Sequence, residues 1–149
     1  MPRRHGRSAT GPNAAPVVVR AAEPLIQIDT SFLIRALVKG SAQDRALRIW
    51  LKNGETLAIS AIAWGEFLCG PAEVSQVDLA ARVVPERLDF SGDDATLAAR
   101  LFNASGRRRG SFVDCMIAAT AIRAEMALAT VNLEDFRRFA EAGLILART

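Results

Sequence analysis

The sequence is poor in the residues that most enzymes use for acid–base and nucleophilic chemistry. Its one histidine, His5, lies among the first 23 residues, ahead of every apolar segment that could form a core. Histidine-based acid–base catalysis, histidine-ligated zinc and a Ser-His-Asp triad are therefore excluded. Lysine occurs only at Lys39 and Lys52, and neither follows a glycine-rich loop, so a Walker-type phosphate site is absent.

Cysteine and long apolar runs are also scarce. Cys69 and Cys115 are far apart, lack CxxC spacing and have apolar neighbours, so we expect reduced, buried thiols. No apolar stretch reaches the ~20 residues of a membrane span. The basic start is followed by a short Pro16–Val19 run and by no longer apolar region, which argues against a secretory signal. We therefore expect a cytoplasmic protein without a membrane span.

What is present fits a single folded domain. The chain has 149 residues, half of them hydrophobic, which is enough for one core and too few for two ordinary domains. Residues 1–24 carry the whole net charge of +3, and the remainder is balanced. We therefore predict a disordered basic extension over residues 1–23 and one domain over residues 24–149. The basic pI says little about the surface of the folded part.

Short apolar runs alternate with helical patterns along the folded part. This alternation predicts an α/β fold with a five-stranded parallel sheet and helices on both faces. The predicted strands are residues 25–28, 57–60, 87–90, 128–131 and 144–146. The predicted helices are residues 31–38, 44–52, 62–68, 72–82, a long one from about 92, 114–125 and 133–139. The helix over residues 114–125 is apolar nearly all round, so we expect it between neighbours.

Acidic residues beside apolar segments are the strongest indication of function. Asp29 follows the first strand directly, at the edge where open α/β sheets place their chemistry. Glu66, Asp114 and Asp135 each lie next to another predicted core segment. Carboxylates meeting in one cleft repel by about 4 kcal/mol per pair at 4 Å and a dielectric of 20. An all-oxygen cluster favours a hard cation, Mg²⁺ or Mn²⁺, over zinc, and phosphate esters are its usual substrates.

Each acid also has a structural interpretation. Asp29 could cap the following helix, and Asp114 could be an acid favoured by a helix dipole. Glu66 could occupy an ordinary exposed helical position. Residues 132–135 resemble a helix start, with Asn132 as the N-cap and Asp135 in the first turn.

The order and context of four segments resemble the PIN domain family and, within it, the VapC-type toxin ribonucleases of toxin–antitoxin pairs. The resemblance covers about residues 25–147. The segments are IQIDTSFLI, SAIAWGEFLCG, RRRGSFVDCMIAATA and LATVNLEDF. The third segment departs from the family pattern at residues 111–113, just before its acid. The four together, in this order and at this spacing, are more specific than any one alone.

The resemblance implies a three-layer α/β/α sandwich and Mg²⁺- or Mn²⁺-dependent cleavage of RNA. Asp29, Glu66 and Asp114 match the acidic core of the family, whereas its fourth acid falls at Asn132. Either Asn132 is a weaker ligand or Asp135 serves instead. Hydroxyl positions that support the family's site fall at Thr30 or Ser31 and at Thr130. The family further implies an RNA substrate, a homodimer and a cognate antitoxin.

Two other classes of function are compatible with parts of this pattern. One is a PIN-like module that binds RNA or protein without catalysis. The other is a small phosphatase with Asp29 as nucleophile, which the chain disfavours because it lacks a second Asp two residues later and a suitably placed lysine. The basic run 107–109 either steers RNA or is a solvated helix end, and the second interpretation is favoured.

Overall fold

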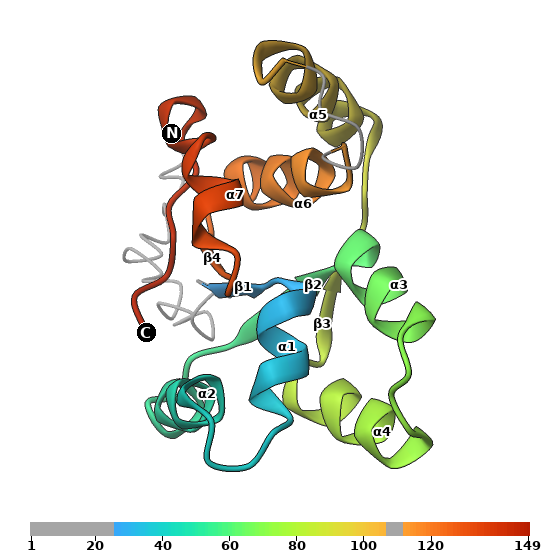
Figure 1. Ribbon diagram of the computed structural model, residues 1–149, viewed down its shortest axis with the longest axis vertical. Coiled ribbons are helices and arrows are strands. Elements are labelled where there is room, and N and C mark those ends of the chain that lie inside the picture. Colours follow the sequence, from blue (N-terminus) through green and yellow to red (C-terminus); the bar gives the residue numbers. More distant parts are fainter. Residues whose placement is uncertain (1–25, 107–111) are drawn as a thin grey trace, which may run out of the picture.

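The protein is built as three layers with the sheet in the middle (Figure 1). The computed structural model describes residues 26–106 and 112–149. The predicted basic extension and the run of arginines at 107–109 lie outside these ranges. In the part described, no helix is long and apolar enough to span a bilayer.

The central sheet is parallel throughout. Its strands are β1 (Ile26–Ile28), β2 (Leu57–Ser60), β3 (Glu86–Leu88) and β4 (Ala127–Ala129). They lie in the order β3-β2-β1-β4, and every pair is parallel. All residues of β1 and β2 are buried, as expected for strands covered on both faces. The predicted α/β fold is therefore confirmed.

The fifth predicted strand, over residues 144–146, is reduced to one isolated bridge between Leu128 and Leu146. Two hydrogen bonds of 2.8 Å hold it beside β4, from the Leu128 N–H to the Ile145 oxygen and from the Ala147 N–H to the Leu128 oxygen. Ile145 is 64% exposed, so no layer of side chains covers its outer face. The segment has the position of an edge strand without a regular ladder, and the sheet has four strands among the described residues.

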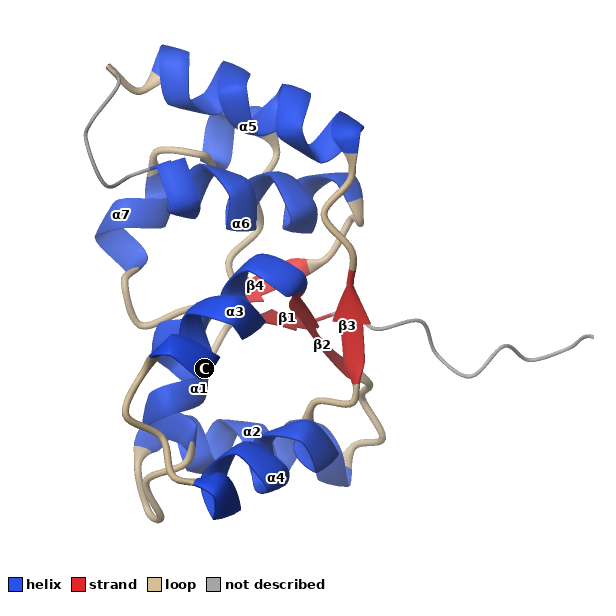
Figure 2. Cartoon of the chain, turned by 90° about the vertical axis from the view of Figure 1, so that its right-hand side faces the viewer, coloured by secondary structure: helices blue, strands red, loops and turns tan. Residues whose placement is uncertain are grey.

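Helices cover both faces of the sheet. They are α1 (Thr30–Ala36), α2 (Ala42–Lys52), α3 (Ala61–Cys69), α4 (Val74–Val83), α5 (Gly92–Ala104), α6 (Phe112–Arg123), α7 (Leu133–Arg137) and a 3-10 turn (Ala140–Ala142). In Figure 1, α1, α2 and α4 lie below the sheet, and α5, α6 and α7 lie above it. Helix α3 lies between these two groups in Figure 2 and contacts α1 on one side and α6 on the other.

Serine residues start three of the helices and so fix where each begins. Ser41, Ser60 and Ser91 accept hydrogen bonds from the backbone N–H three residues later. Ser60 is also the last residue of β2, so the chain passes directly from strand to helix. This abrupt transition places α3, with Glu66, at the carboxyl edge of the sheet.

The core combines aromatic contacts with a helix of small residues. Phe32 stacks on Trp50 with 5.4 Å between ring centroids. Helix α6 buries Ala118, Ala119 and Ala121 and packs against α5, α3 and β4, which confirms its predicted interior position. One expectation is wrong: Cys69 is exposed, because it ends α3 at the Gly70-Pro71 break. Cys115 is buried as predicted.

Candidate active site

The carboxyl ends of β1, β2 and β4 meet at one edge of the sheet because all three strands run in the same direction. Asp29 follows β1, Ser60 ends β2 and Thr130 follows β4. The Asp29 N–H extends the β1–β4 ladder by donating to the Ala129 oxygen at 2.9 Å. Asp29 and Thr130 therefore lie side by side as a direct consequence of strand register.

Asp29 is the most firmly held carboxylate of the site, and only 3% of the residue is exposed. Its Oδ2 accepts hydrogen bonds from Ser31 Oγ at 2.8 Å and Thr130 Oγ1 at 2.7 Å. Asp29 occupies the N-cap position of α1 but makes no side-chain cap bond, so the capping interpretation is wrong. No described residue donates to Oδ1. Asp29 is thus fixed through one oxygen and has the other available.

The two hydroxyls also fix the loop after β4. The Val131 N–H donates to Ser31 Oγ at 3.2 Å, and the Asn132 N–H donates to Thr130 Oγ1 at 3.1 Å. Both backbone amides precede α7, which begins at Leu133. Ser31 and Thr130, two of the hydroxyls expected near the site, therefore form one network that orients both Asp29 and the start of α7.

Glu66 reaches the same edge from α3. Thr30 Oγ1 lies 3.0 Å from both Glu66 Oε1 and the Ala63 oxygen, and its single hydrogen serves one acceptor at a time. Although the residue is exposed overall, partial shielding of its carboxyl group from water raises the pKa of Glu66. The Thr30 hydrogen bond opposes this rise, and the negative charge of Asp29 adds to it. Thr30 therefore links α1 to the functional face of α3.

Asp114, in the first turn of α6, has the most perturbed acidity of the site. Burial and the charge of Asp29 raise its pKa, Arg138 lowers it, and Asp135 and Glu66 raise it further, with a net value of about 6. The Asp114 side chain is 30% exposed, and its Oδ2 lies 3.9 Å from Arg138 Nη2. The other three predicted acids thus all act electrostatically on Asp114.

The two remaining predicted residues lie at the solvent-exposed rim of the candidate site. Asn132 and Asp135 are both exposed, and Asn132 holds the N-cap position of α7 without a side-chain cap bond. Asp135 bears on Asp114 through its charge, whereas Asn132 is tied to Thr130 through its backbone. The sequence analysis gave no role to Arg138, which the fold of α7 brings to Asp114. The adjacent Arg137-Arg138 pair carried no pattern to distinguish one from the other.

The donor set fits a hard divalent cation in its chemistry, because it contains carboxylates, hydroxyls and an amide, and the ion pair with Arg138 offsets only part of the negative charge. Across residues 26–106 and 112–149, however, no three side chains among Asp, Glu, His and Cys are grouped closely enough to hold a metal as they stand. Electrostatic interactions act over longer distances than metal coordination bonds. The carboxylates can therefore raise the pKa of Glu66 and Asp114 without lying close enough together to share a metal. Mg²⁺ keeps several waters in its shell and is usually bound through only one or two carboxylates, so it does not require three of them in direct contact.

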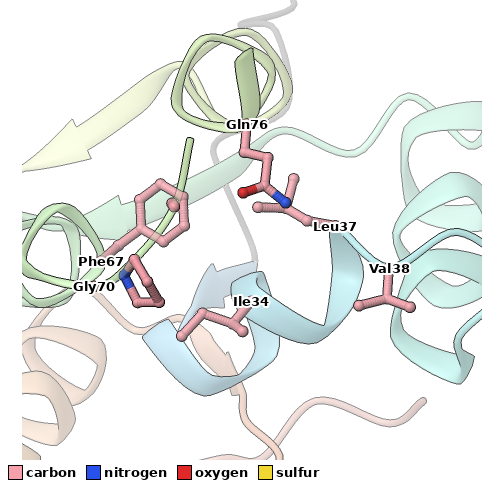
Figure 3. Close-up of a pocket in the computed structure, with 8 residues that line it drawn as sticks. Ile34, Leu37, Val38, Phe67, Gly70 and Gln76 are labelled. Atoms are coloured by element: carbon pink, nitrogen blue, oxygen red, sulfur yellow. The ribbon is translucent and has the colours of Figure 1, made fainter. Parts of the chain in front are cut away.

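A separate apolar hollow of about 230 Å³ lies away from the acids, between α1, the end of α3 and α4. Ile34 of α1 and Leu37, which follows the helix, lie across the hollow from Phe67 and Gln76, and Val38 also lines it (Figure 3). None of the four acids lines it. Its chemistry suits apolar side chains of a partner, and the charged edge of the sheet remains the better candidate for catalysis.

Comparison with known structures agrees with this architecture. A chain in the crystal structure of VapBC2 from Rickettsia felis bound to a promoter DNA fragment is 26% identical, with a TM-score of 0.67 over 82% of this chain and 96% of that one. A chain of a toxin–antitoxin complex from Klebsiella pneumoniae is 26% identical, with a TM-score of 0.61 over 74% and 89%. VapC20 from Mycobacterium tuberculosis, a Sarcin-Ricin loop cleaving toxin, is 24% identical, with a TM-score of 0.60 over 83% and 99%.

A comparison with curated proteins finds no significant match. The PIN domain family, in contrast, matches residues 26–142, from the start of β1 to the turn after α7. The matched segment contains the acids, the hydroxyl network and the whole four-stranded sheet described above. The protein therefore belongs to the PIN domain family.

Proposed function

We propose that the protein is a divalent-metal-dependent endoribonuclease that acts as the toxin of a type II toxin–antitoxin pair. The observation that carries this proposal is the meeting of the strand ends at buried Asp29, with Asp29, Glu66 and Asp135 all acting on Asp114 and its pKa raised to about 6. Perturbed carboxylates gathered at the carboxyl edge of a parallel sheet are typical of a functional site. Membership of the PIN domain family supports the same reaction class.

Asp29, Glu66 and Asp114 would hold Mg²⁺ or Mn²⁺, with Asn132 or Asp135 completing the set. When bound, such a cation supplies charge stabilisation at phosphoryl oxygens and lowers the pKa of water. The chain's own residues do the positioning. Ser31 and Thr130 hold Asp29 through one oxygen, and Thr30 steadies Glu66 from the neighbouring helix.

RNA is the proposed substrate, and an antitoxin is the proposed partner. The solved relatives include a Sarcin-Ricin loop cleaving toxin and two assemblies that contain an antitoxin. The apolar hollow between α1, α3 and α4 offers a surface for the antitoxin, with Ile34 and Val38 about half exposed beside it. We also propose a homodimer, and light scattering after size-exclusion chromatography should give twice the mass of one chain.

The ribonuclease proposal is tested by incubating the purified chain with a mixed RNA pool, with and without EDTA. We expect cleavage that EDTA stops and that added Mn²⁺ restores. Undiminished cleavage in EDTA would refute the metal dependence. RNA binding without cleavage at any metal concentration would favour the non-catalytic binding module instead.

A further inference from the structure

Arg138 has an unusual environment for an arginine beside a carboxylate. Its Nη2 lies 3.9 Å from Asp114 Oδ2, which is an ion pair but too long for a hydrogen bond. The buried Nε has no hydrogen-bond partner among the described residues, and no described residue accepts from the rest of the guanidinium. The five N–H donors of this side chain therefore lack an acceptor among the described residues, and those on the exposed part of the guanidinium can reach a ligand.

The position of the guanidinium is nevertheless fixed. Its central carbon lies 4.6 Å from the centre of the Phe139 ring, a distance typical of a cation–π contact. Phe139 is 2% exposed and packs edge-on against buried Phe136. The arginine is held by an apolar surface, which orients its planar head without using its donors.

Arg138 and Asp114 are neighbours that both remain accessible to a ligand, because 22% of the Arg138 side chain and 30% of the Asp114 side chain are exposed. Among the charges that shift the pKa of Asp114, Arg138 is positive, whereas Asp29, Asp135 and Glu66 are negative. A purely structural counter-ion would be expected to form short, bidentate bonds with a carboxylate. Arg138 makes no such bond with Asp114, because the 3.9 Å between their nearest atoms is too long.

We propose that Arg138 is a substrate-binding residue that grips a phosphate of the RNA backbone beside Asp114. A phosphodiester offers two oxygens that match the arginine fork, and it supplies the acceptors that the described residues do not. This inference rests on the proposed ribonuclease function. It adds a positively charged residue that binds the polyanion beside the acids that act on Asp114.

The neighbouring Arg137 provides a matched control. It is the last residue of α7, which Arg138 caps, and it is exposed and already paired with Glu134 at 2.6 Å. Arg137→Gln and Arg138→Gln remove the same charge one residue apart. Arg138→Lys keeps the charge and removes the planar fork.

The test measures binding of a fluorescein-labelled, mixed-sequence RNA oligonucleotide by anisotropy over a series of KCl concentrations. The full chain carries Asp29→Asn so that RNA is bound without being cut. Adding Arg138→Gln should weaken binding about tenfold. It should also lower the salt slope by about 0.7, the value of one phosphate contact on a single strand. Arg138→Lys should recover part of the affinity, and Arg137→Gln should match the parent.

Kinetics of otherwise wild-type protein give the second readout, with Arg138→Gln raising KM more than it lowers kcat. Affinity, salt slope and KM that are unchanged in folded Arg138→Gln would overturn the role of Arg138, and the ribonuclease would stand. If Arg138→Gln does not fold, the same result for Arg138→Lys decides. A wild-type chain that neither cleaves nor binds RNA would overturn both proposals.

Discussion

Two carboxylates of the candidate site, Asp29 after β1 and Asp114 on α6, are held in different ways. On the β1 side, Asp29 is buried and two neutral hydroxyls donate to one of its oxygens. On the α6 side, Asp114 is partly open and interacts with charges, three acids and Arg138, at distances longer than a hydrogen bond. Hydrogen bonds are directional and so fix the orientation of a carboxylate, whereas longer-range charge interactions change its pKa without fixing its orientation. Asp29 is thus preorganised, whereas no hydrogen bond from a described residue holds the Asp114 carboxylate in one orientation.

The largest expected effect is the loss of the fixed carboxylate. Asp29→Asn keeps the shape of the side chain and removes its charge, so RNA cleavage should fall by more than about 100-fold and expression of the variant should no longer stop growth. Cleavage rates and growth after induction measure the effect, with circular dichroism as the check on folding. Equal toxicity from a well-folded Asp29→Asn protein would contradict the site assignment.

The hydroxyl network should matter next. Thr130→Val removes a hydrogen bond to buried Asp29 Oδ2, so we expect a roughly 10- to 100-fold higher Mn²⁺ requirement and about 1 to 2 kcal/mol lower stability. Thr96→Val is the matched control, because Thr96 lies on α5 and bonds only the Gly92 oxygen. If the two variants require the same Mn²⁺ concentration, the hydrogen bond from Thr130 to Asp29 does not contribute to metal binding.

The raised pKa of Asp114 predicts how the stability of the protein depends on pH. In the folded protein the pKa of Asp114 is about 6, above its usual 3.8. The folded state therefore holds the proton more tightly, so this group stabilises the fold fully below about pH 4, and that stabilisation is lost as pH rises through about 6.

Asp114→Asn stays neutral and escapes this loss. Relative to wild type in EDTA, it should gain about 1 to 2 kcal/mol between about pH 4 and pH 7.5, after allowance for partial exposure of the carboxyl. Urea unfolding at the two pH values measures the gain. A stability difference that does not change with pH would show that Asp114 is not strained by its neighbours.

The smallest effects are expected at the rim, where Asn132 and Asp135 compete for the fourth position. Asn132→Ala and Asp135→Ala should each raise the Mn²⁺ requirement less than Asp114→Ala does, and a residue that only starts α7 should cost about 1 kcal/mol of stability and nothing else. If Asp135→Ala shifts the Mn²⁺ titration as far as Asp114→Ala does, Asp135 is a direct ligand.

Local patterns were enough to predict most of the fold. The β2 strand and the interior position of α6 follow from apolar runs whose length and periodicity decide their structure. The last strand was overestimated, because pairing depends on what covers it, and Ile145 is largely exposed. Cys69 was misplaced for a similar reason, since an apolar neighbourhood in sequence does not reveal which helix end faces solvent.

The sequence by itself determined which groups are available: carboxylates after core segments, hydroxyls beside them, and no histidine in the folded part. It also identified Asp29, because a charge directly after a buried strand is costly unless it is paired or binds a cation. Only the tertiary structure decided how these groups interact. Ser31 and Thr130 are 99 residues apart and meet on Asp29 through the parallel register of β1 and β4. Arg138 reaches Asp114 because α7 packs on α6, and contacts between distant segments leave no periodic mark on the sequence.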